Sequence, residues 1–275
     1  MAEQTFVTLN DGVSIPQMGL GTWQLSDTEV TGVALEAFRL GYRHIDTAAG
    51  YENERGVGEA VRQSGLAREE VFVTSKLRNG EHGFDETLRA FDGTMQRLGL
   101  DVLDLYLIHW PMPRVDRYVE SWKAFIRLRE EGRIRSIGVS NFNPDHLERI
   151  IGETGVVPSV NQIELHPRFQ RRDLRAVHAD KGIAIESWTP LGKRNVLGDP
   201  AIVSIAQKHG KTPGQVVIRW HIEQGLILFP KTANAARLAE NFDVFDFALD
   251  GEDMERIAAL DTADGRTGPD PLVFT

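Results

Sequence analysis

Short apolar runs alternate along the chain with longer segments whose apolar residues recur at helical spacing. Eight runs have the length and composition of buried strands: Gly19–Trp23, His44–Ala48, Val71–Leu77, Val102–His109, Ile134–Asn141, Val160–Leu165, Ala184–Pro190 and Leu226–Lys231. Amphipathic segments that fit helices lie between them, such as Thr28–Leu40, Asp85–Leu98, Val119–Glu131 and Pro213–Gln224. This alternation predicts an α/β fold with a parallel sheet. Eight units predict a (β/α)₈ TIM barrel formed by residues 1–275 as a single domain.

Helix-capping signals support these boundaries. Ser26 and Glu29 fit a capping box at the start of the first helix. Thr212, Pro213 and Gln215 fit a cap, a proline in the first turn and the partner of a second box. The helix boundaries are therefore predicted independently of the apolar periodicity.

Both ends of the chain carry additions to the barrel. Thr5–Leu9 and Val13–Ile15 flank Asn10-Asp11-Gly12, a sequence typical of a tight β-hairpin. This N-terminal hairpin precedes the first barrel strand, so we expect it to plug the bottom of the barrel. Leu249–Leu260 predicts an extra C-terminal helix, and Asp261–Thr275 a loop-like tail.

Composition and net charge limit the binding partners and the cellular compartment that we expect for this protein. The net charge of −9 disfavours nucleic acid and anionic membranes, because both bind basic patches. The chain has no cysteine, which fits the reducing cytoplasm and excludes thiolate metal sites. We expect no signal peptide, since the first residues lack a basic segment followed by an apolar core, and no membrane span. Without a heptad repeat, a monomer is expected.

Polar residues end several of the predicted strands. Asp46 lies in the second strand, Lys76 ends the third and His109 ends the fourth, while Tyr51 follows in the loop after Asp46. Function in such barrels gathers at the C-terminal ends of the strands. Taken singly, each residue also fits an ordinary structural role, such as a turn or a packed side chain. Lys76 is the hardest to explain that way, since a charge near the core needs a partner, and Asp46 is suitably placed.

These four residues suit carbonyl reduction. Hydride addition to a carbonyl leaves an alkoxide that must be protonated, and a tyrosine hydroxyl is protonated at neutral pH. A nearby ammonium group stabilises tyrosinate and lowers the pKa of the hydroxyl. We therefore predict Tyr51 as general acid, Lys76 and Asp46 as its charged support, and His109 as a hydrogen-bond donor to the carbonyl oxygen.

Longer motifs point to a known family. Gly41-Tyr42-Arg43-His44-Ile45-Asp46-Thr47-Ala48, followed by Tyr51-Glu52-Asn53-Glu54, resembles the first signature of the aldo-keto reductases. The same holds for Leu105–Pro111, Ile137–Phe142 and Asn161–Glu164. The resemblance spans about Leu9 to Leu260 and favours the bacterial branch that includes 2,5-diketo-D-gluconate reductases. It implies an oxidoreductase that acts on CH–OH groups with NADP as acceptor.

The resemblance also implies roles for individual residues. Asp46, Tyr51, Lys76 and His109 match the catalytic tetrad of the family. The cofactor NADPH is expected to contact Ser140, Asn141 and Gln162 through its carboxamide, Trp188 through its nicotinamide ring, and Leu191 nearby. The substrate is expected to contact Trp23, Trp110 and His109. Short loops around the pocket suggest broad specificity for small aldehydes, ketones, dicarbonyls or keto-sugar acids.

The chain has no dinucleotide-binding glycine fingerprint. Gly56-Val57-Gly58 lies inside a helical pattern, so we interpret it as helix packing. Instead, basic residues meet a helix N-terminus after the eighth strand, which makes an anion site. By resemblance, Lys231, Thr232 and Arg237 bind the 2′-phosphate of NADPH, and Glu240 and Asn241 contact its adenine side.

Two other functions fit the same barrel. Asp46, His109 and His166 end strands two, four and six, so a metal-dependent hydrolase is one alternative. Against it, Lys76 would repel the metal. A catalytically silent binding or structural member of the family is the other, although such a member is expected to lose the tyrosine or the lysine.

Overall fold

The computed structural model describes residues 4–274, and eight parallel strands form its centre. Each strand pairs with its neighbour in chain order, and a bridge between Met18 and Leu228 joins the two outermost strands. The (β/α)₈ barrel is therefore confirmed. Its strands are β3 (Leu20–Gly21), β4 (His44–Asp46), β5 (Phe72–Leu77), β6 (Leu103–Ile108), β7 (Ile134–Ser140), β8 (Val160–Glu164), β9 (Ala184–Trp188) and β10 (Ile227–Leu228).

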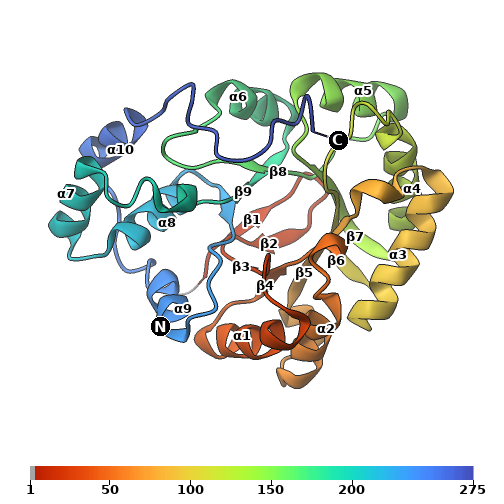
Figure 1. Cartoon of the computed structure of the whole chain (residues 1–275), viewed down its shortest axis with the longest axis horizontal. Coiled ribbons are helices and arrows are strands. Elements are labelled where there is room, and N and C mark those ends of the chain that lie inside the picture. The colour runs from red at the N-terminus through yellow and green to blue at the C-terminus, as the bar shows by residue number, and fades with distance from the viewer. Residues whose placement is uncertain (1–3, 275) are drawn as a thin grey trace.

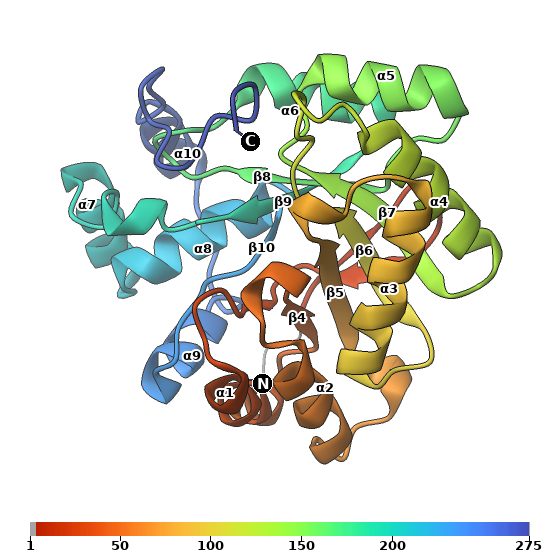
Figure 2. The same ribbon diagram turned by 45° about the vertical axis from the view of Figure 1, so that its right-hand side comes forward.

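Helices surround the sheet, with α3 and α4 lying outside β5, β6 and β7 (Figures 1 and 2). Both predicted capping boxes are present, at Ser26 and at Thr212. The helices are α1 (Asp27–Leu40), α2 (Glu54–Gln63), α3 (Phe84–Leu98), α4 (Tyr118–Glu130), α5 (Pro144–Thr154), α6 (Arg172–Lys181), α7 (Pro200–His209), α8 (Pro213–Glu223), α9 (Ala235–Phe242) and α10 (Gly251–Ala258). Short 3₁₀ turns are η1 (Ala49–Tyr51), η2 (Arg68–Glu70), η3 (Asn79–Glu81) and η4 (Gly192–Arg194). None of these helices has the length and apolar character needed to cross a bilayer.

The two glycines of α2 allow close helix packing. A Cβ atom at Gly56 would lie 2.0 Å from the backbone oxygen of Asp27, and one at Gly58 would lie 1.9 Å from that of Leu98. Both distances are far inside van der Waals contact, so a side chain at either position would push α2 away from its neighbours. The prediction that these glycines serve packing rather than phosphate binding is confirmed.

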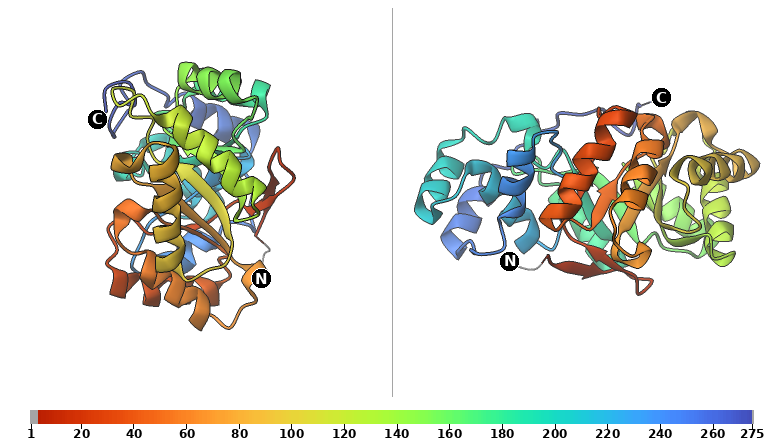
Figure 3. Two further views of the ribbon diagram at one scale, coloured as in Figure 1. Left: turned by 90° about the vertical axis from the view of Figure 1, so that its right-hand side faces the viewer. Right: turned by 90° about the horizontal axis from the view of Figure 1, so that it is seen from below.

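The N-terminal hairpin forms the floor of the barrel. Strands β1 (Phe6–Thr8) and β2 (Ser14–Pro16) pair antiparallel. Leu9 and Ile15 join a buried cluster with barrel residues that include Phe72, Leu105, Leu107, Val160, Ile227 and Phe229. The hairpin and the C-terminal tail lie at opposite ends of the molecule (Figure 3). The predicted plug is thus present.

Packing outside the strands buries the large aromatic residues. Trp122 on α4 and Trp220 on α8 are 0% and 1% exposed, as expected for core positions. Period-2 alternation along β6 would place Leu103, Leu105 and Leu107 on one face of the strand. Leu105 and Leu107 point into the barrel, but Leu103 belongs to the cluster between the sheet and the helices. Leu103 is the first residue of the strand.

Candidate active site

An ion pair lies at the C-terminal ends of β4 and β5. The Lys76 ammonium donates to both carboxylate oxygens of Asp46, at 2.7 and 2.8 Å, and to the backbone oxygen of Thr47 at 2.9 Å. Lys76 is completely buried. Burial alone would lower its pKa, but the neighbouring acidic groups Asp46, Tyr51 and Glu186 together outweigh this effect and raise the pKa of Lys76. The predicted pair therefore holds a fixed positive charge below the barrel mouth.

Tyr51 and His109 face each other above this pair. Tyr51 ends η1, and its ring centre is 5.0 Å from the Lys76 nitrogen. The rings of Tyr51 and His109 are 5.6 Å apart in an edge-to-face arrangement, and both side chains are half-buried. The four residues that sequence analysis selected thus converge from three successive strand ends.

The pKa values at this cluster differ from the simple expectation. Burial raises the pKa of Tyr51, and although Lys76 opposes this shift, it does not reverse it. Lys76 thus lowers the pKa of Tyr51 as predicted, but burial has the larger and opposite effect, because loss of hydration destabilises tyrosinate more than the ammonium stabilises it. Burial, assisted by Lys76, lowers the pKa of His109 to about 3. At neutral pH, Tyr51 is protonated and His109 is neutral.

The residues expected at the cofactor carboxamide form one network beside this cluster. The Ser140 hydroxyl donates to the backbone oxygen of Gln162 at 2.8 Å. The Asn141 amide nitrogen donates to the backbone oxygen of His109 at 3.0 Å, and its oxygen accepts from the Trp188 indole at 2.9 Å. Asn141 adopts a φ of 63°, a left-handed conformation that asparagine tolerates. Asn141 therefore ties His109 to Trp188.

Aromatic side chains line the mouth, and the tail crosses it (Figure 1). Trp188 is half-buried, which favours the resemblance over simple core packing. Trp110 is 9% exposed and packs on Phe274 of the tail, with ring centres 4.3 Å apart. Trp23 is 54% exposed. Leu191 follows β9 and is half-buried.

Glu164 fastens the tail, a role that the sequence did not indicate. Its carboxylate accepts from the backbone nitrogen of Thr267 at 2.6 Å, from the Thr267 hydroxyl at 2.5 Å and from the backbone nitrogen of Gly268 at 3.0 Å. A Cβ atom at Gly268 would lie 2.3 Å from the Trp188 ring. The tail thus passes directly against Trp188.

The predicted phosphate-binding residues gather at the start of α9. Lys231 and Arg237 are exposed, and within residues 4–274 neither forms an ion pair, whereas nearby Lys211 binds Asp243 and Asp246. Thr232 is 8% exposed, and its hydroxyl accepts from the backbone nitrogen of Asn234, the helix cap.

Glu240 and Asn241, expected on the adenine side, lie near the other end of α9. The Glu240 carboxylate accepts from the Thr212 hydroxyl at 2.8 Å, and Asn241 is 7% exposed. Arg237 lies in the first turn of α9 and Lys231 precedes the helix, so the two cations are separated along the chain from Glu240 and Asn241.

Sequence analysis missed Glu186, which is fully buried on β9 beside the cluster. The Gln162 amide nitrogen donates to Glu186 at 2.8 Å and to Asp46 at 2.9 Å. The available signal was an acidic residue inside an apolar strand, the same signal that singled out Lys76. Burial, and then the neighbouring Asp46, raises the pKa of Glu186 to about 8.

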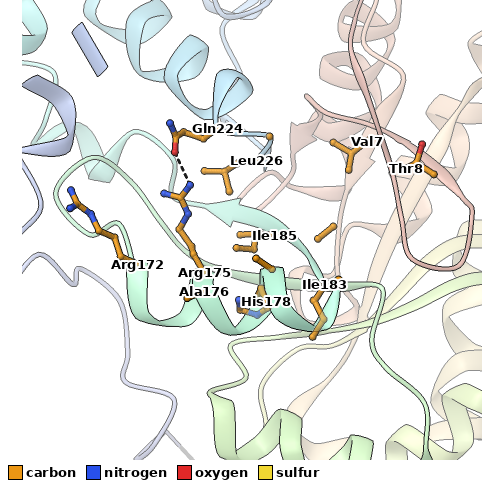
Figure 4. A pocket seen from close by; sticks show the side chains of 14 residues that line it. Val7, Thr8, Arg172, Arg175, Ala176, His178, Ile183, Ile185, Gln224 and Leu226 are labelled. Carbon is orange, nitrogen blue, oxygen red and sulfur yellow. Dashed lines mark hydrogen bonds between the residues drawn. The ribbon is translucent and has the colours of Figure 1, made fainter. Parts of the chain in front are cut away.

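A separate cavity of about 570 Å³ lies at the other end of β9 (Figure 4). Its lining comes from α6, the start of β9, the hairpin strand β1 and the turn between α8 and β10, and includes Arg172, Arg175 and Leu226. The Arg175 guanidinium donates to Gln224 at 2.7 Å. Because the hairpin closes this end, the cavity is distant from the strand ends that carry Lys76 and Tyr51.

Two residues of the alternative metal site, Asp46 and His166, form hydrogen bonds with other side chains. Asp46 binds Lys76 through both oxygens, and the His166 Nε2 atom lies 3.3 Å from Glu164. No group of three or more His, Asp or Glu suited to a metal ion occurs in the part of the chain that the structure describes.

Comparisons with known proteins agree with this geometry. The family model described as Aldo/keto reductase family matches residues 17–262. An aldo-keto reductase of Mycolicibacterium smegmatis is 56% identical over 98% of this chain and 97% of its own. The methylglyoxal reductase DkgA of Escherichia coli K12 is 50% identical over 100% and 99%. A crystal structure of a Gox0644 mutant in complex with NADPH has a TM-score of 0.96 at 53% identity, covering 99% of each chain.

These matches show that the chain is an oxidoreductase built on a (β/α)₈ barrel. Within that class, it belongs to the aldo/keto reductase family.

Proposed function

We propose that this protein uses NADPH to reduce small aldehydes, ketones, dicarbonyls or keto-sugar acids to alcohols, with Tyr51 as the general acid. The observation that carries the proposal is the placement of the Tyr51 ring 5.0 Å from a completely buried Lys76 that Asp46 fixes. NADPH, when bound, supplies the hydride that reduces the carbonyl carbon. The binding of NADPH by a Gox0644 mutant of 53% identity supports this choice of cofactor.

The chain's own residues then manage the proton. The raised pKa of Tyr51 keeps its hydroxyl protonated, so the hydroxyl can donate its proton to the carbonyl oxygen. The Lys76 ammonium stabilises the tyrosinate that remains until solvent returns the proton. Neutral His109 donates an N–H to the carbonyl oxygen without releasing its proton, which orients the substrate.

The donor set at α9 fits the phosphate of NADPH. Lys231 and Arg237 are exposed, and the first turn of α9 offers backbone N–H groups. We propose that Lys231, Thr232 and Arg237 hold the 2′-phosphate, with Glu240 and Asn241 toward the adenine. Ser140, Asn141, Gln162, Trp188 and Leu191 would then hold the nicotinamide end.

An open pocket suits small, varied carbonyl compounds. Trp23 is 54% exposed, and Trp110 packs on Phe274 of the tail. Methylglyoxal is a first substrate to assay, because a relative of 50% identity is a methylglyoxal reductase. The proposed substrate contacts are Trp23, Trp110 and His109.

Replacing Tyr51 by Phe tests the proposal. The variant keeps the ring and removes the proton, so kcat for methylglyoxal should fall by about 10² to 10⁴. NADPH binding, measured by quenching of tryptophan fluorescence, should be unchanged. Near-normal turnover in the variant would refute Tyr51 as the acid. A wild-type protein that binds NADPH but reduces no carbonyl in a broad panel would refute the enzymatic function.

We further propose that the protein acts as a single-domain monomer in the cytoplasm. The absence of cysteine fits a reducing compartment. Trp122 and Trp220 are buried within the chain. Neither side chain is therefore available for contact with a second subunit.

A further inference from the structure

The side-chain amide of Gln162 lies between two carboxyl groups. Its nitrogen donates one hydrogen bond to Asp46 Oδ1 at 2.9 Å and one to Glu186 Oε2 at 2.8 Å. An amide nitrogen has two hydrogens, so both are used. A flipped amide would place its oxygen against the Asp46 carboxylate, which can only accept hydrogen bonds, and this is unfavourable. The two carboxyl groups therefore fix the amide in one orientation, with Oε1 directed away from both.

We propose that Glu186 is a positioning residue that, together with Asp46, orients Gln162 so that its Oε1 accepts an N–H from the nicotinamide carboxamide. The inference rests on the proposed assignment of Gln162 to the cofactor carboxamide. It adds a residue to which neither the sequence motifs nor the comparisons give a role. Asp46 serves Lys76 as well, whereas Glu186 has Gln162 as its hydrogen-bond partner.

The surroundings of Glu186 suit this task. Glu186 is the register partner of Gln162 on β8 and of Ile227 on β10, so the two side chains project from adjacent strands. The ionisable groups that face it are Asp46 from β4 and Lys76 from β5. Its second oxygen, Oε1, has no hydrogen-bond partner among the described residues. The contact to Gln162 is thus the one polar interaction that accounts for a buried carboxyl at this position.

Protonation of Glu186 is compatible with the proposed contact. Burial and Asp46 raise its pKa to about 8, so the neutral acid predominates at pH 7. A neutral carboxyl group still offers a carbonyl oxygen to the Gln162 N–H. A glutamine at position 186 would offer the same acceptor, whereas a methionine of similar length would offer none. These two substitutions therefore separate the acceptor from the volume of the side chain.

A cofactor analogue isolates the hydrogen bond in question. The 3-acetylpyridine analogue of NADP⁺ carries a methyl ketone in place of the carboxamide, so it keeps the carbonyl oxygen and lacks the N–H. Dissociation constants of NADP⁺ and of this analogue are measured by quenching of tryptophan fluorescence, without turnover. We expect the wild-type protein to prefer NADP⁺ about tenfold, because the analogue leaves the Gln162 acceptor unpaired.

The variants give distinct expected results. Gln162→Met removes the acceptor, so its preference should fall to nearly one. Glu186→Met should also lose most of the preference, and Glu186→Gln should retain it. Glu186→Ser, which is too short to reach Gln162, should behave like Glu186→Met and replaces it if the methionine variant does not fold. Thermal melting confirms that each protein compared is folded.

Two outcomes would overturn the inference in different ways. If Gln162→Met loses the preference while Glu186→Met and Glu186→Ser keep it, Gln162 binds the carboxamide but Glu186 does not position it. If Gln162→Met itself keeps a tenfold preference, the proposed role of Gln162 fails, and that of Glu186 with it. Reduction of carbonyls by the wild-type protein is assayed separately, so a failure of the enzymatic function is recognised on its own.

Discussion

The two ends of this barrel are built from the same strands but on different principles. At the floor, Phe72, Leu105 and Phe229 pack with the hairpin into an apolar cluster. At the mouth, Asp46 and Lys76 are buried as charges that compensate each other at 2.7 Å. The floor is stabilised by the burial of closely packed apolar side chains. The mouth has buried charges in fixed positions where apolar side chains could otherwise pack. The proposed function thus uses one end of a scaffold that the other end stabilises.

The largest effect is expected from breaking the pair at the mouth. Lys76→Met should reduce kcat by about 10² to 10⁴, because Tyr51 loses the charge that stabilises its anion. It should also lower the free energy of unfolding by about 3–5 kcal/mol, because Asp46 is left buried without its partner. Steady-state kinetics and urea unfolding measure the two effects. Retention of both normal turnover and normal stability would show that the pair is dispensable.

A cavity at the floor should affect stability and leave the chemistry intact. Leu105→Ala removes a fully buried side chain, so the free energy of unfolding should fall by about 2–5 kcal/mol. Leu105→Met nearly conserves the volume and should cost less than about 1.5 kcal/mol. Both proteins should keep the kcat of the wild type. A selective loss of kcat in Leu105→Ala would mean that the two ends are coupled.

A smaller effect is expected from Arg237 on α9, which forms no ion pair within the described residues. Arg237→Ala should raise the KM for NADPH about tenfold, the loss of one charge-assisted hydrogen bond at an exposed site. Its KM for NADH, which lacks the 2′-phosphate, should not change. Arg89→Ala, at an exposed arginine on α3 that pairs with Glu86, is the matched control. An unchanged KM for NADPH in Arg237→Ala would place the phosphate elsewhere.

One buried group at each end, His44 at the floor and Glu186 at the mouth, should contribute to stability with opposite pH dependence. At the floor, burial lowers the pKa of His44 from 6.5 to about 3, so stability is lost as the pH falls through this range. At the mouth, the pKa of Glu186 is raised from 4.5 to about 8, so its contribution is lost as the pH rises from 4.5 through 8. His44→Gln should flatten the acid side of the stability profile, and Glu186→Gln the alkaline side. Unfolding midpoints between pH 4 and 9 check both slopes, and unchanged slopes in either variant would contradict the assignment.

Much of the molecule was predictable because its signals are local. Strand runs such as Phe72–Leu77 and capping boxes such as Ser26 with Glu29 depend on neighbours within a few residues. Their periodicity alone predicts eight strands with helices between them. Lys76 and Asp46 were also accessible, because a charge at the end of a buried strand needs a partner of opposite sign. The sequence by itself therefore determined the barrel, its floor and the identity of the central ion pair.

The tertiary structure decided what depends on contacts between distant segments. It brought Gln162 against Glu186 and Asp46, which lie 24 and 116 residues away from it in the chain. It also set the balance that keeps the pKa of Tyr51 raised despite Lys76, because hydration depends on everything that surrounds the hydroxyl. Likewise, only the folded chain lays the tail on Glu164 and Trp188. Burial and long-range hydrogen bonds are properties of the assembled barrel, and no local pattern encodes them.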